Sequence, residues 1–338
     1  MDDRILEHYL EEFRLGCELK GAESETLLDA LIGCEDIELT ASVLGAWNEK
    51  GVTEDELFSL TSLMRGRMNR ITSRHEKYVD IVGTGGSSSK TFNVSTAAAF
   101  VIAGSGLPVA KHGNRAATSS SGSFDVLAAL GVNVDVEPSE TERNLNENGL
   151  CFMFAPRFHS LSPNLAAARR LVGMPTVFNN LGPLCNPAET PHNVIGVWDK
   201  HLLDSTARVL ARLGARRSWV VYGEGGLDEI ALKGTTLVAE VKDDEISVFE
   251  ISAADIDVFT LAKDVPSNCP AEESAKLIRA VLSNEFADRD TERLVLINAA
   301  AAIYVSGNAA DLSEAYRIAE ETVRTGAALA KLDQLVKG

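Results

Sequence analysis

The sequence predicts an α/β protein in which a small all-helical part precedes a larger domain with a mostly parallel central sheet flanked by helices. Residues 1–75 have helical periodicity only, whereas strand-like and helix-like segments alternate from Tyr78 onward. Polar clusters directly follow three of the strand-like segments. Ligands of parallel α/β sheets bind beyond the carboxyl ends of the strands, so we expect these clusters to meet in one crevice.

Residues 1–75 are expected to form a helical domain. Apolar residues recur at helical spacing in several stretches, and Thr53 is followed at the correct distance by Glu56 for a capping box at the start of a further helix. No strand signal appears before Val79. A small helical unit with apolar surface to spare suits dimerisation, so we expect a dimerisation domain here.

Residues 76–338 are expected to form the α/β domain. The predicted strands are 79–82, 107–110, 132–136 and 218–222, and 149–154 is a further buried apolar segment. A hairpin is expected between about 234 and 258, with its turn at 242–245. The predicted helices are 97–103, 124–130, 271–282, 288–306 and 311–335.

Composition and charge exclude several classes of protein. The 338 residues are 45% hydrophobic and 24% charged, with a net charge of −17, which disfavours a nucleic-acid-binding surface. The five cysteines contain no Cys-x-x-Cys pair, so neither a disulfide framework nor a zinc site is expected. The acidic opening lacks the basic region of a secretory signal, and no apolar run is long enough to span a bilayer. We therefore expect a cytoplasmic protein without membrane contact.

The first polar cluster follows the apolar run 79–82. Three glycines lie in Gly83-Thr84-Gly85-Gly86, and the hydroxyl-rich stretch 87–96 leads into a helix-forming segment. Close backbone approach and a helix N-terminus favour phosphate binding. The P-loop pattern is absent, and the dinucleotide fingerprint fails at Ser88. A simple tight turn is the alternative, but the Thr-x-Asn-x-Ser-Thr continuation favours a ligand.

The second cluster, Lys111–Arg115, places two cations, an imidazole and an amide directly after a strand. An acidic protein that binds phosphate needs such local positive charge. The run 118–123 adds hydroxyl groups that can cap a helix or bind another phosphate. The alternative is a solvated basic turn.

The third cluster contains Asp228 and Glu229, which follow the strand 218–222. Carboxylate oxygens are ligands that magnesium prefers, and a diphosphate substrate would supply the remaining ligands. An ordinary acidic loop is the alternative. Further along the crevice, His159 and Arg169 are candidates because a guanidinium suits a substrate carboxylate, although a structural role explains them equally well.

With these residues assembled, the chain resembles the anthranilate phosphoribosyltransferase family of tryptophan biosynthesis. That family joins anthranilate to phosphoribosyl diphosphate and releases pyrophosphate. The resemblance covers nearly the whole chain. Its motifs are Gly83–Gly86, Thr91–Thr96, Lys111–Arg115, Gly122-Ser123-x-Asp125, Phe178–Pro187 and Gly226–Glu229.

The resemblance implies a role for most of these motifs. Lys111, His112, His159 and Arg169 would act at the catalytic centre, with either histidine a conceivable proton acceptor. Gly83, Asn114, His159 and Arg169 would receive anthranilate. Ser95, Asp228 and Glu229 would hold two magnesium ions. Phosphoribosyl diphosphate would be bound by Gly83, Gly86, Ser87, Thr91, Asn93, Val94, Ser95, Thr96, Lys111, His112, Gly113, Asn114, Arg115, Ala116, Ala117, Thr118, Ser119 and Ser123.

The resemblance also implies a nucleoside phosphorylase-like phosphoribosyltransferase fold and a homodimer. The family's helical domain is discontinuous, so part of 160–190 is expected to join residues 1–75. Mechanistically, magnesium would neutralise the departing pyrophosphate while positive charge grows at the anomeric carbon. The amine of anthranilate would then attack from the opposite face, without a covalent enzyme intermediate.

Several positions depart from the family pattern. Ser87 stands where the family has an aspartate, Ser120 replaces a lysine, Phe124 replaces a small residue and Asn180 an apolar one, and 160–163 differs throughout. These departures leave open a paralogue with another aromatic acceptor and an inactive binding protein. A pyrimidine nucleoside phosphorylase is a further alternative, which the retained Asp228-Glu229 pair disfavours because phosphate needs no metal clamp.

Overall fold

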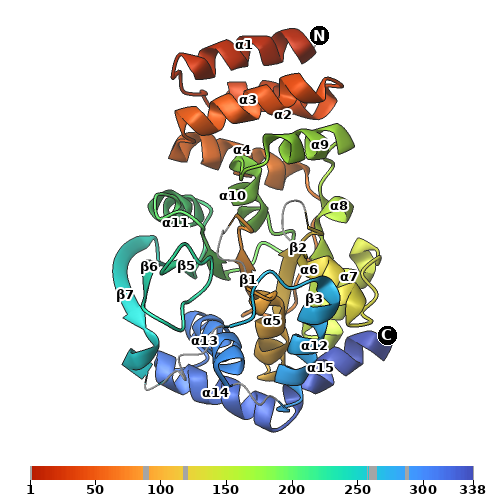
Figure 1. Cartoon of the computed structure of the whole chain (residues 1–338), viewed down its shortest axis with the longest axis vertical. Helices are drawn as coiled ribbons and strands as arrows, with labels where there is room; N and C mark the ends of the chain where they lie inside the picture. The colour runs from red at the N-terminus through yellow and green to blue at the C-terminus, as the bar shows by residue number, and fades with distance from the viewer. Residues whose placement is uncertain are drawn as a thin grey trace.

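The computed structural model describes residues 2–86, 91–116, 121–256, 258, 265–285 and 289–337. Figure 1 shows the N-terminal helices stacked at one end of the molecule and a sheet with its covering helices at the other. Within the described ranges, no helix is both long and apolar enough to cross a membrane.

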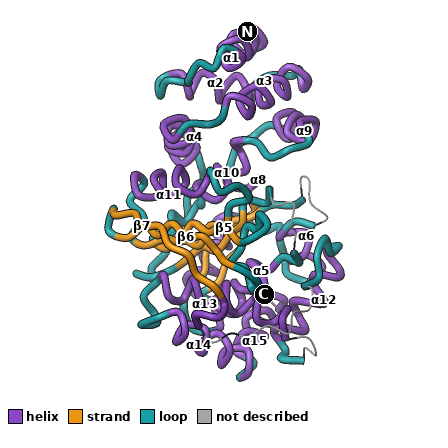
Figure 2. The backbone as a smooth tube through the Cα atoms, turned by 60° about the vertical axis from the view of Figure 1, so that its left-hand side comes forward, coloured by secondary structure: helices purple, strands orange, loops and turns teal. Residues whose placement is uncertain are grey.

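The sheet has seven strands in the order β3-β2-β1-β4-β5-β6-β7. The first five strands of that order are parallel and the last two are antiparallel, which confirms the predicted mixed α/β class. Figure 2 shows the strands as one continuous band below the N-terminal helices. The strands are β1 (Val79–Gly83), β2 (Val109–Gly113), β3 (Leu150–Phe154), β4 (His192–Gly196), β5 (Arg217–Gly223), β6 (Thr235–Lys242) and β7 (Glu245–Ser252).

Helices cover both faces of the sheet. On one face, α5 (Val94–Gly104) packs against β1 and β2, and α13 (Arg289–Val305) packs against α5. Around these two lie α6 (Ser123–Ala129), α12 (Ala271–Leu282), α14 (Leu312–Arg324) and α15 (Ala327–Lys337). On the other face, α11 (Leu202–Arg212) packs against β5 and β6, and α10 (Val177–Leu184) contacts β2. The short helix η1 (Ala253–Ile256) follows β7, and α7 (Pro138–Asn148) packs against β3.

The predicted helical character of residues 1–75 is confirmed by four helices. These are α1 (Asp2–Arg14), α2 (Glu23–Gly33), α3 (Ile37–Lys50) and α4 (Glu54–Arg67). Two distant segments join them: α9 (Pro163–Val172) packs against α3, and α10 packs against α4. The short helix α8 (Ala155–Phe158) follows β3 and precedes α9 in the chain.

Two predicted elements differ from the structure, and the structure has a strand, β4, that was not predicted. Residues 132–136 form no strand: the Val132 N–H donates to Leu127 O and the Asp135 N–H donates to the side chain of Asn133, so local bonds replace a ladder. The predicted helix 311–335 is two helices, α14 and α15, because Gly326 between them has a φ of +76°. The hairpin of β6 and β7 is confirmed.

Glu56 is fully buried at the start of α4 and links this helix to α3 and to the connection between α1 and α2. Its carboxylate accepts hydrogen bonds from Leu19 N at 2.7 Å, Trp47 Nε1 at 3.0 Å and Thr53 N at 2.9 Å. Lys50 Nζ lies 2.8 Å away and balances the charge. The Thr53 side chain completes the capping box that the sequence predicts.

We expect Glu56→Ala to destabilise the protein by about 3–5 kcal/mol, because it leaves a buried ammonium and several buried donors without their acceptor. Denaturant unfolding measures this loss. Asp29→Ala is the control, since the Asp29–Arg67 pair is exposed and worth about 1 kcal/mol or less. A loss at Glu56 no larger than the control's would contradict this account of the helical core.

Candidate active site

A crevice of about 570 Å³ opens at the carboxyl ends of the parallel strands. Strand order reverses between β1 and β4, and ligands of open α/β sheets bind at such a switch point. Residues of all three predicted clusters line the crevice, which confirms that they meet. These include Gly83, Thr91, Asn93, Ser95, Lys111, His112, Gly113, Asn114, Arg115, Ala116, Ser123, Asp228 and Glu229.

The loop that carries Asp228 lies directly on the ends of β1 and β4. The Gly85 N–H donates to Asp228 Oδ2 at 2.9 Å. Gly83 pairs with Gly196, and a Cβ added at Gly196 would lie 1.7 Å from the carbonyl oxygen of Asp228. Both strand ends therefore need glycine so that the carboxylate loop can approach. Gly85 has a φ of +70°, which glycine adopts without strain.

Glu229 is held against the first cluster. Its Oε2 accepts from Thr91 Oγ1 at 2.8 Å, and the backbone of Ser95 also hydrogen-bonds this carboxylate. Burial and the neighbouring charge of Asp228 raise the pKa of Glu229 to about 8, although Thr91 and Lys111 act in the opposite direction. Two carboxylates thus lie side by side at the glycine turn.

These residues fit a magnesium ion. The neighbouring carboxylates of Asp228 and Glu229 destabilise each other's negative charge, and a bound cation would offset this repulsion. Together with the hydroxyl group of Ser95, which also lines the crevice, they form a set of oxygen donors of the kind that magnesium prefers. No cluster of three or more His, Cys, Asp or Glu side chains suited to a metal occurs in the described part of the chain. The remaining ligands would therefore be water and substrate oxygens, as is common for magnesium.

Lys111 lies at the floor of the crevice and is buried. Its Nζ donates to Ile81 O at 2.5 Å. Burial lowers the pKa of Lys111, while the negative charges of Asp80 and Glu229 oppose that shift. Asp80 is a buried residue of β1, and Asn186 Nδ2 donates to its carboxylate at 2.7 Å. The Lys111 ammonium group thus lies close to the carboxyl groups of Asp80 and Glu229.

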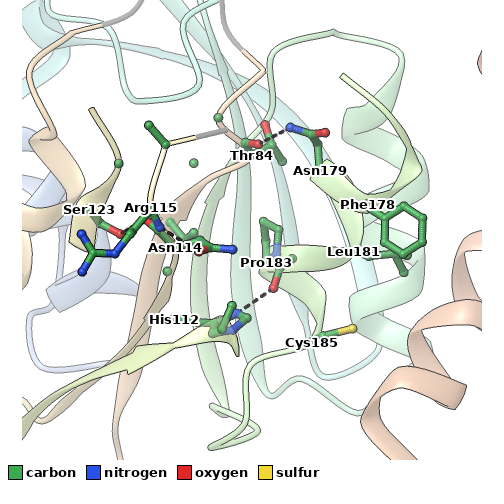
Figure 3. A pocket seen from close by; sticks show the side chains of 18 of the residues that line it. Thr84, His112, Asn114, Arg115, Ser123, Phe178, Asn179, Leu181, Pro183 and Cys185 are labelled. Carbon is green, nitrogen blue, oxygen red and sulfur yellow. Dashed lines mark hydrogen bonds between the residues drawn. The ribbon is translucent and has the colours of Figure 1, made fainter. Parts of the chain in front are cut away.

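His112 and His159 form an edge-to-face pair, with ring centres 5.1 Å apart. Burial lowers the pKa of His112 to about 3 and that of His159 to about 4. His112 Nδ1 lies 3.0 Å from Gly182 O, so it carries the proton, and Nε2 is a buried acceptor without a partner among the described residues. Both rings are therefore neutral at pH 7. Figure 3 shows His112 below Pro183 in the crevice.

We expect His159 to stabilise the fold less as the pH falls. The unfolded chain binds a proton at His159 below its ordinary pKa of 6.5, whereas the folded chain does so only below about 4. Between these values protonation favours unfolding, and the stability lost amounts to up to about 3 kcal/mol. Denaturant unfolding of the wild type and of His159→Gln from pH 7 to pH 4 measures it.

The stability of the wild type relative to His159→Gln should decline across that window. His8→Gln is the control for the substitution itself, because His8 is exposed on α1 and does not line the crevice. A pH-independent difference for His159→Gln would contradict the depressed pKa.

The far end of the crevice is apolar and contains one arginine. Arg169 on α9 lies with its guanidinium carbon 5.4 Å from the ring centre of Phe178 on α10. Burial lowers the pKa of Arg169 to about 10, and its Nε is buried with no hydrogen-bond partner in the described ranges. The apolar walls come from Met64, Leu161, Leu165, Phe178, Leu181 and Pro183. This end suits a flat, largely apolar anion.

Figure 3 shows the two sides of the crevice facing each other. Asn114, Arg115 and Ser123 lie on one side, and Phe178 and Leu181 of α10 lie on the other. Asn179 Nδ2 donates to Thr84 O at 3.3 Å and links α10 to the glycine turn. Residues 178–187 match a family motif, but the resemblance implies no role for them.

Some predicted ligand residues do not line the crevice. Val94 and Thr96 are fully buried at the start of α5, behind it. Gly86 faces Trp198 and Pro175, because an added Cβ would lie 2.5 Å and 2.9 Å from their side chains. The predicted residues Ser87, Ala117, Thr118 and Ser119, and the departure at Ser120, lie outside the described residues.

The departures from the family pattern have different surroundings. Leu161, Ser162 and Pro163 line the crevice, and Ser162 also caps α9. Phe124 is instead buried against Phe154, with ring centres 4.8 Å apart. Asn180 points away from the crevice, where its Oδ1 accepts from Thr206 Oγ1 of α11 at 3.2 Å. The polar change at 180 is thus satisfied by a neighbouring helix and does not alter the site.

A glycine turn beside a carboxylate pair, at the carboxyl ends of parallel strands, is typical of an enzyme site that binds an anionic ligand. The family model described as "Glycosyl transferase family, a/b domain" matches residues 75–329. The chain is thus an enzyme of the glycosyl transferase class.

Relatives narrow this class. The chain is 41% identical to anthranilate phosphoribosyltransferase of Azorhizobium caulinodans over 97% of its length and 95% of the relative's. It is 44% identical to that of Myxococcus xanthus over 86% and 85% of the two chains. It belongs to the anthranilate phosphoribosyltransferase family.

Solved structures agree with this assignment. The Thermus thermophilus anthranilate phosphoribosyltransferase superposes with a TM-score of 0.86 at 34% identity, covering 97% of this chain and 98% of the other. The Saccharomyces cerevisiae enzyme in complex with PRPP and Mg superposes with a TM-score of 0.88 at 26% identity, covering 98% and 97%.

Proposed function

We propose that this chain transfers the 5-phosphoribosyl group of phosphoribosyl diphosphate (PRPP) to the amine of anthranilate. The products are N-(5-phosphoribosyl)anthranilate and pyrophosphate, and the reaction depends on magnesium. One observation carries the proposal. At one end of a single crevice, Asp228 and Glu229 accept hydrogen bonds from Gly85 and Thr91, and at the other end Arg169 lies between apolar walls, with a buried Nε that has no hydrogen-bond partner among the described residues. The yeast relative in complex with PRPP and Mg supports this choice of substrate and ion.

The diphosphate end binds and orients PRPP. Asp228, Glu229 and Ser95 would hold up to two magnesium ions, which supply positive charge to the departing diphosphate when bound. Thr91, Asn93 and the second cluster offer hydrogen-bond donors around them. The role of the chain here is to hold the leaving group in line with the acceptor, so that much of the entropic cost is met on binding.

The acceptor end orients anthranilate. Arg169 would bind its carboxylate through the planar guanidinium, while Phe178 and Leu181 cover the ring and exclude water. The neutral amine of an aromatic acceptor is already nucleophilic, so the site needs no strong base. His112 and His159 are neutral near pH 7 and add no positive charge beside the anomeric carbon, where positive charge grows.

A fluorescence assay tests the proposal. Purified protein is mixed with magnesium, PRPP and anthranilate, and the loss of anthranilate fluorescence is followed together with pyrophosphate release. Both signals should appear at equal rates and disappear without magnesium or without PRPP. Turnover of another aromatic amine in preference to anthranilate would identify a different acceptor, and no turnover of any would refute the transferase proposal.

We also propose that residues 1–75 together with part of 160–190 form the dimerisation domain, that 76–338 form the PRPP-binding domain, and that the enzyme works in the cytoplasm. The packing of α9 on α3 supports the discontinuous domain. This region has three large apolar side chains that are exposed: Leu15 (77%), Leu171 (58%) and Met174 (55%). Their exposure supports an apolar surface that a second copy of the chain covers in the dimer. Light scattering on the whole chain tests the dimer.

A further inference from the structure

Asp125, in the first turn of α6, bonds to two backbone segments that lie on either side of residues 117–121. Its Oδ2 accepts from Ala116 N at 2.9 Å and from Gly122 N at 3.0 Å, and its Oδ1 accepts from Arg115 Nη1 at 3.2 Å. Burial acts to raise the pKa of Asp125, but these hydrogen bonds outweigh it and lower the pKa. The group is therefore a carboxylate at neutral pH.

The two segments also touch each other directly. A Cβ added at Gly122 would lie 2.3 Å from Ala116 N, so backbone packs on backbone there. Ser123 Oγ and Phe124 N each donate to Asn114 O at 3.3 Å. We call these two segments the loop neck, which consists of residues 114–116 and 122–125.

The contacts of Asp125 exceed those of a helix cap. A carboxylate at the third helical position ordinarily accepts only from the N–H that precedes the helix, here that of Gly122. The bonds to Ala116 and Arg115 reach residues nine and ten positions earlier in the chain. These two bonds therefore hold residues 114–116 against residues 122–125, which the start of α6 does not require.

The loop neck faces the crevice, whereas Asp125 does not. Asn114, Arg115, Ala116, Gly122 and Ser123 all line the crevice, and the lining does not include Asp125. We infer that Asp125 is a positioning residue for PRPP: its carboxylate closes the loop neck and so fixes the donors of residues 114–116 and Ser123 before the substrate arrives. This inference rests on the proposed function.

Removing the carboxylate would leave two backbone N–H groups without their acceptor and release the Arg115 side chain. PRPP would then have to order the loop neck as it binds, which weakens binding. We expect the KM for PRPP and its dissociation constant to rise about tenfold or more, because charge-assisted hydrogen bonds are lost. The KM for anthranilate should rise much less, because Asn114 is the one loop-neck residue assigned to anthranilate, whereas Arg169 and Phe178 lie on other elements.

The experiment compares Asp125→Ala, Asp125→Asn and the wild type in steady-state kinetics and in calorimetric titration with PRPP and magnesium. Asp125→Asn keeps an oxygen acceptor for the backbone but loses the charge that holds Arg115, so it should rescue part of the affinity. Asp311→Ala is the matched control, since Asp311 caps α14 by accepting from Glu314 N at 2.7 Å, remote from the crevice. Thermal unfolding of all variants measures the structural cost.

The expected result is a selective rise in the PRPP constants of Asp125→Ala, with a melting temperature no lower than that of Asp311→Ala. Unchanged PRPP constants beside a lowered melting temperature would make Asp125 a helix cap only and overturn the inference. An equal rise for both substrates would also overturn it. A wild type that binds and turns over no PRPP would refute the proposed function itself, and this inference with it.

Discussion

Replacing Glu229 by glutamine should lower kcat by about 100-fold or more while leaving the fold intact. The amide keeps an oxygen for the Thr91 hydroxyl, which donates to Glu229 at 2.8 Å in the wild type. It removes the negative charge that the proposed magnesium ions need, and losing a charged metal ligand in a partly buried site typically costs that much or more. The assay is initial-rate kinetics across a magnesium titration, in which the variant should need a higher magnesium concentration.

Glu224→Gln is the matched control for this change. Glu224 lies on the same loop after β5, is exposed, and accepts from Thr235 N at 3.0 Å outside the crevice. It should leave kcat and the magnesium requirement unaltered. Full activity of Glu229→Gln with an unchanged magnesium requirement would remove Glu229 from the proposed metal site.

Replacing Arg169 by alanine should raise the KM for anthranilate by about 30-fold or more, with little change in the affinity for PRPP. Arg169 carries a buried Nε that has no acceptor among the described residues, and its guanidinium lies near the Phe178 ring. A substrate carboxylate is the acceptor this group lacks, and such a charge-assisted pair is worth about 2–3 kcal/mol. Kinetics with each substrate varied in turn measure the two effects separately.

The neighbouring Arg170 provides the control. It is exposed on the same helix, and Arg170→Ala removes an equal charge from α9 without touching the crevice. It should leave both KM values near those of the wild type. Equal losses for anthranilate and PRPP in Arg169→Ala would show that Arg169 supports the whole crevice and does not select the acceptor.

The diphosphate end of the site was predictable because its residues are local in sequence. Each of the clusters at Gly83, Lys111 and Asp228 directly follows a strand, and parallel strands bring such segments to one edge. The hairpin of β6 and β7 was also predictable, from its polar turn. These features depend on residues that are close in the sequence, so the pattern of apolar and polar residues is enough to predict them.

Strand β4 was not predicted because its first two residues are polar, which is unusual for a buried strand. His192 and Asn193 are polar but buried, and Asn193 is satisfied by hydrogen bonds with Thr190 and Ser218. The sequence pattern that could have predicted this strand is its last three residues, since β4 ends in Val-Ile-Gly much as β1 ends in Ile-Val-Gly. Residues 132–136 gave the opposite error, since their alternating pattern belongs to a loop whose apolar side packs on the core.

The acceptor end could not be assembled from periodicity alone. Met64, Arg169 and Phe178 belong to three helices, and only the tertiary packing of α4, α9 and α10 brings them into one lining. The resemblance named Arg169 but not the apolar walls. The bonds of Asp125 to Ala116 and Arg115 were likewise invisible, because a carboxylate at that position already has a local explanation as a cap.

The two ends of the crevice are built from different parts of the chain. Backbone amides and strand-end glycines such as Gly83 and Gly196 form one end, and side chains of separate helices form the other. Almost any replacement of a glycine there blocks the carboxylate loop, so that end has little freedom to vary. Leu161, Phe178 and Leu181 lie on other segments, so replacing one of them does not block the carboxylate loop. New acceptors are therefore best sought by mutating the helices and leaving the strand ends alone.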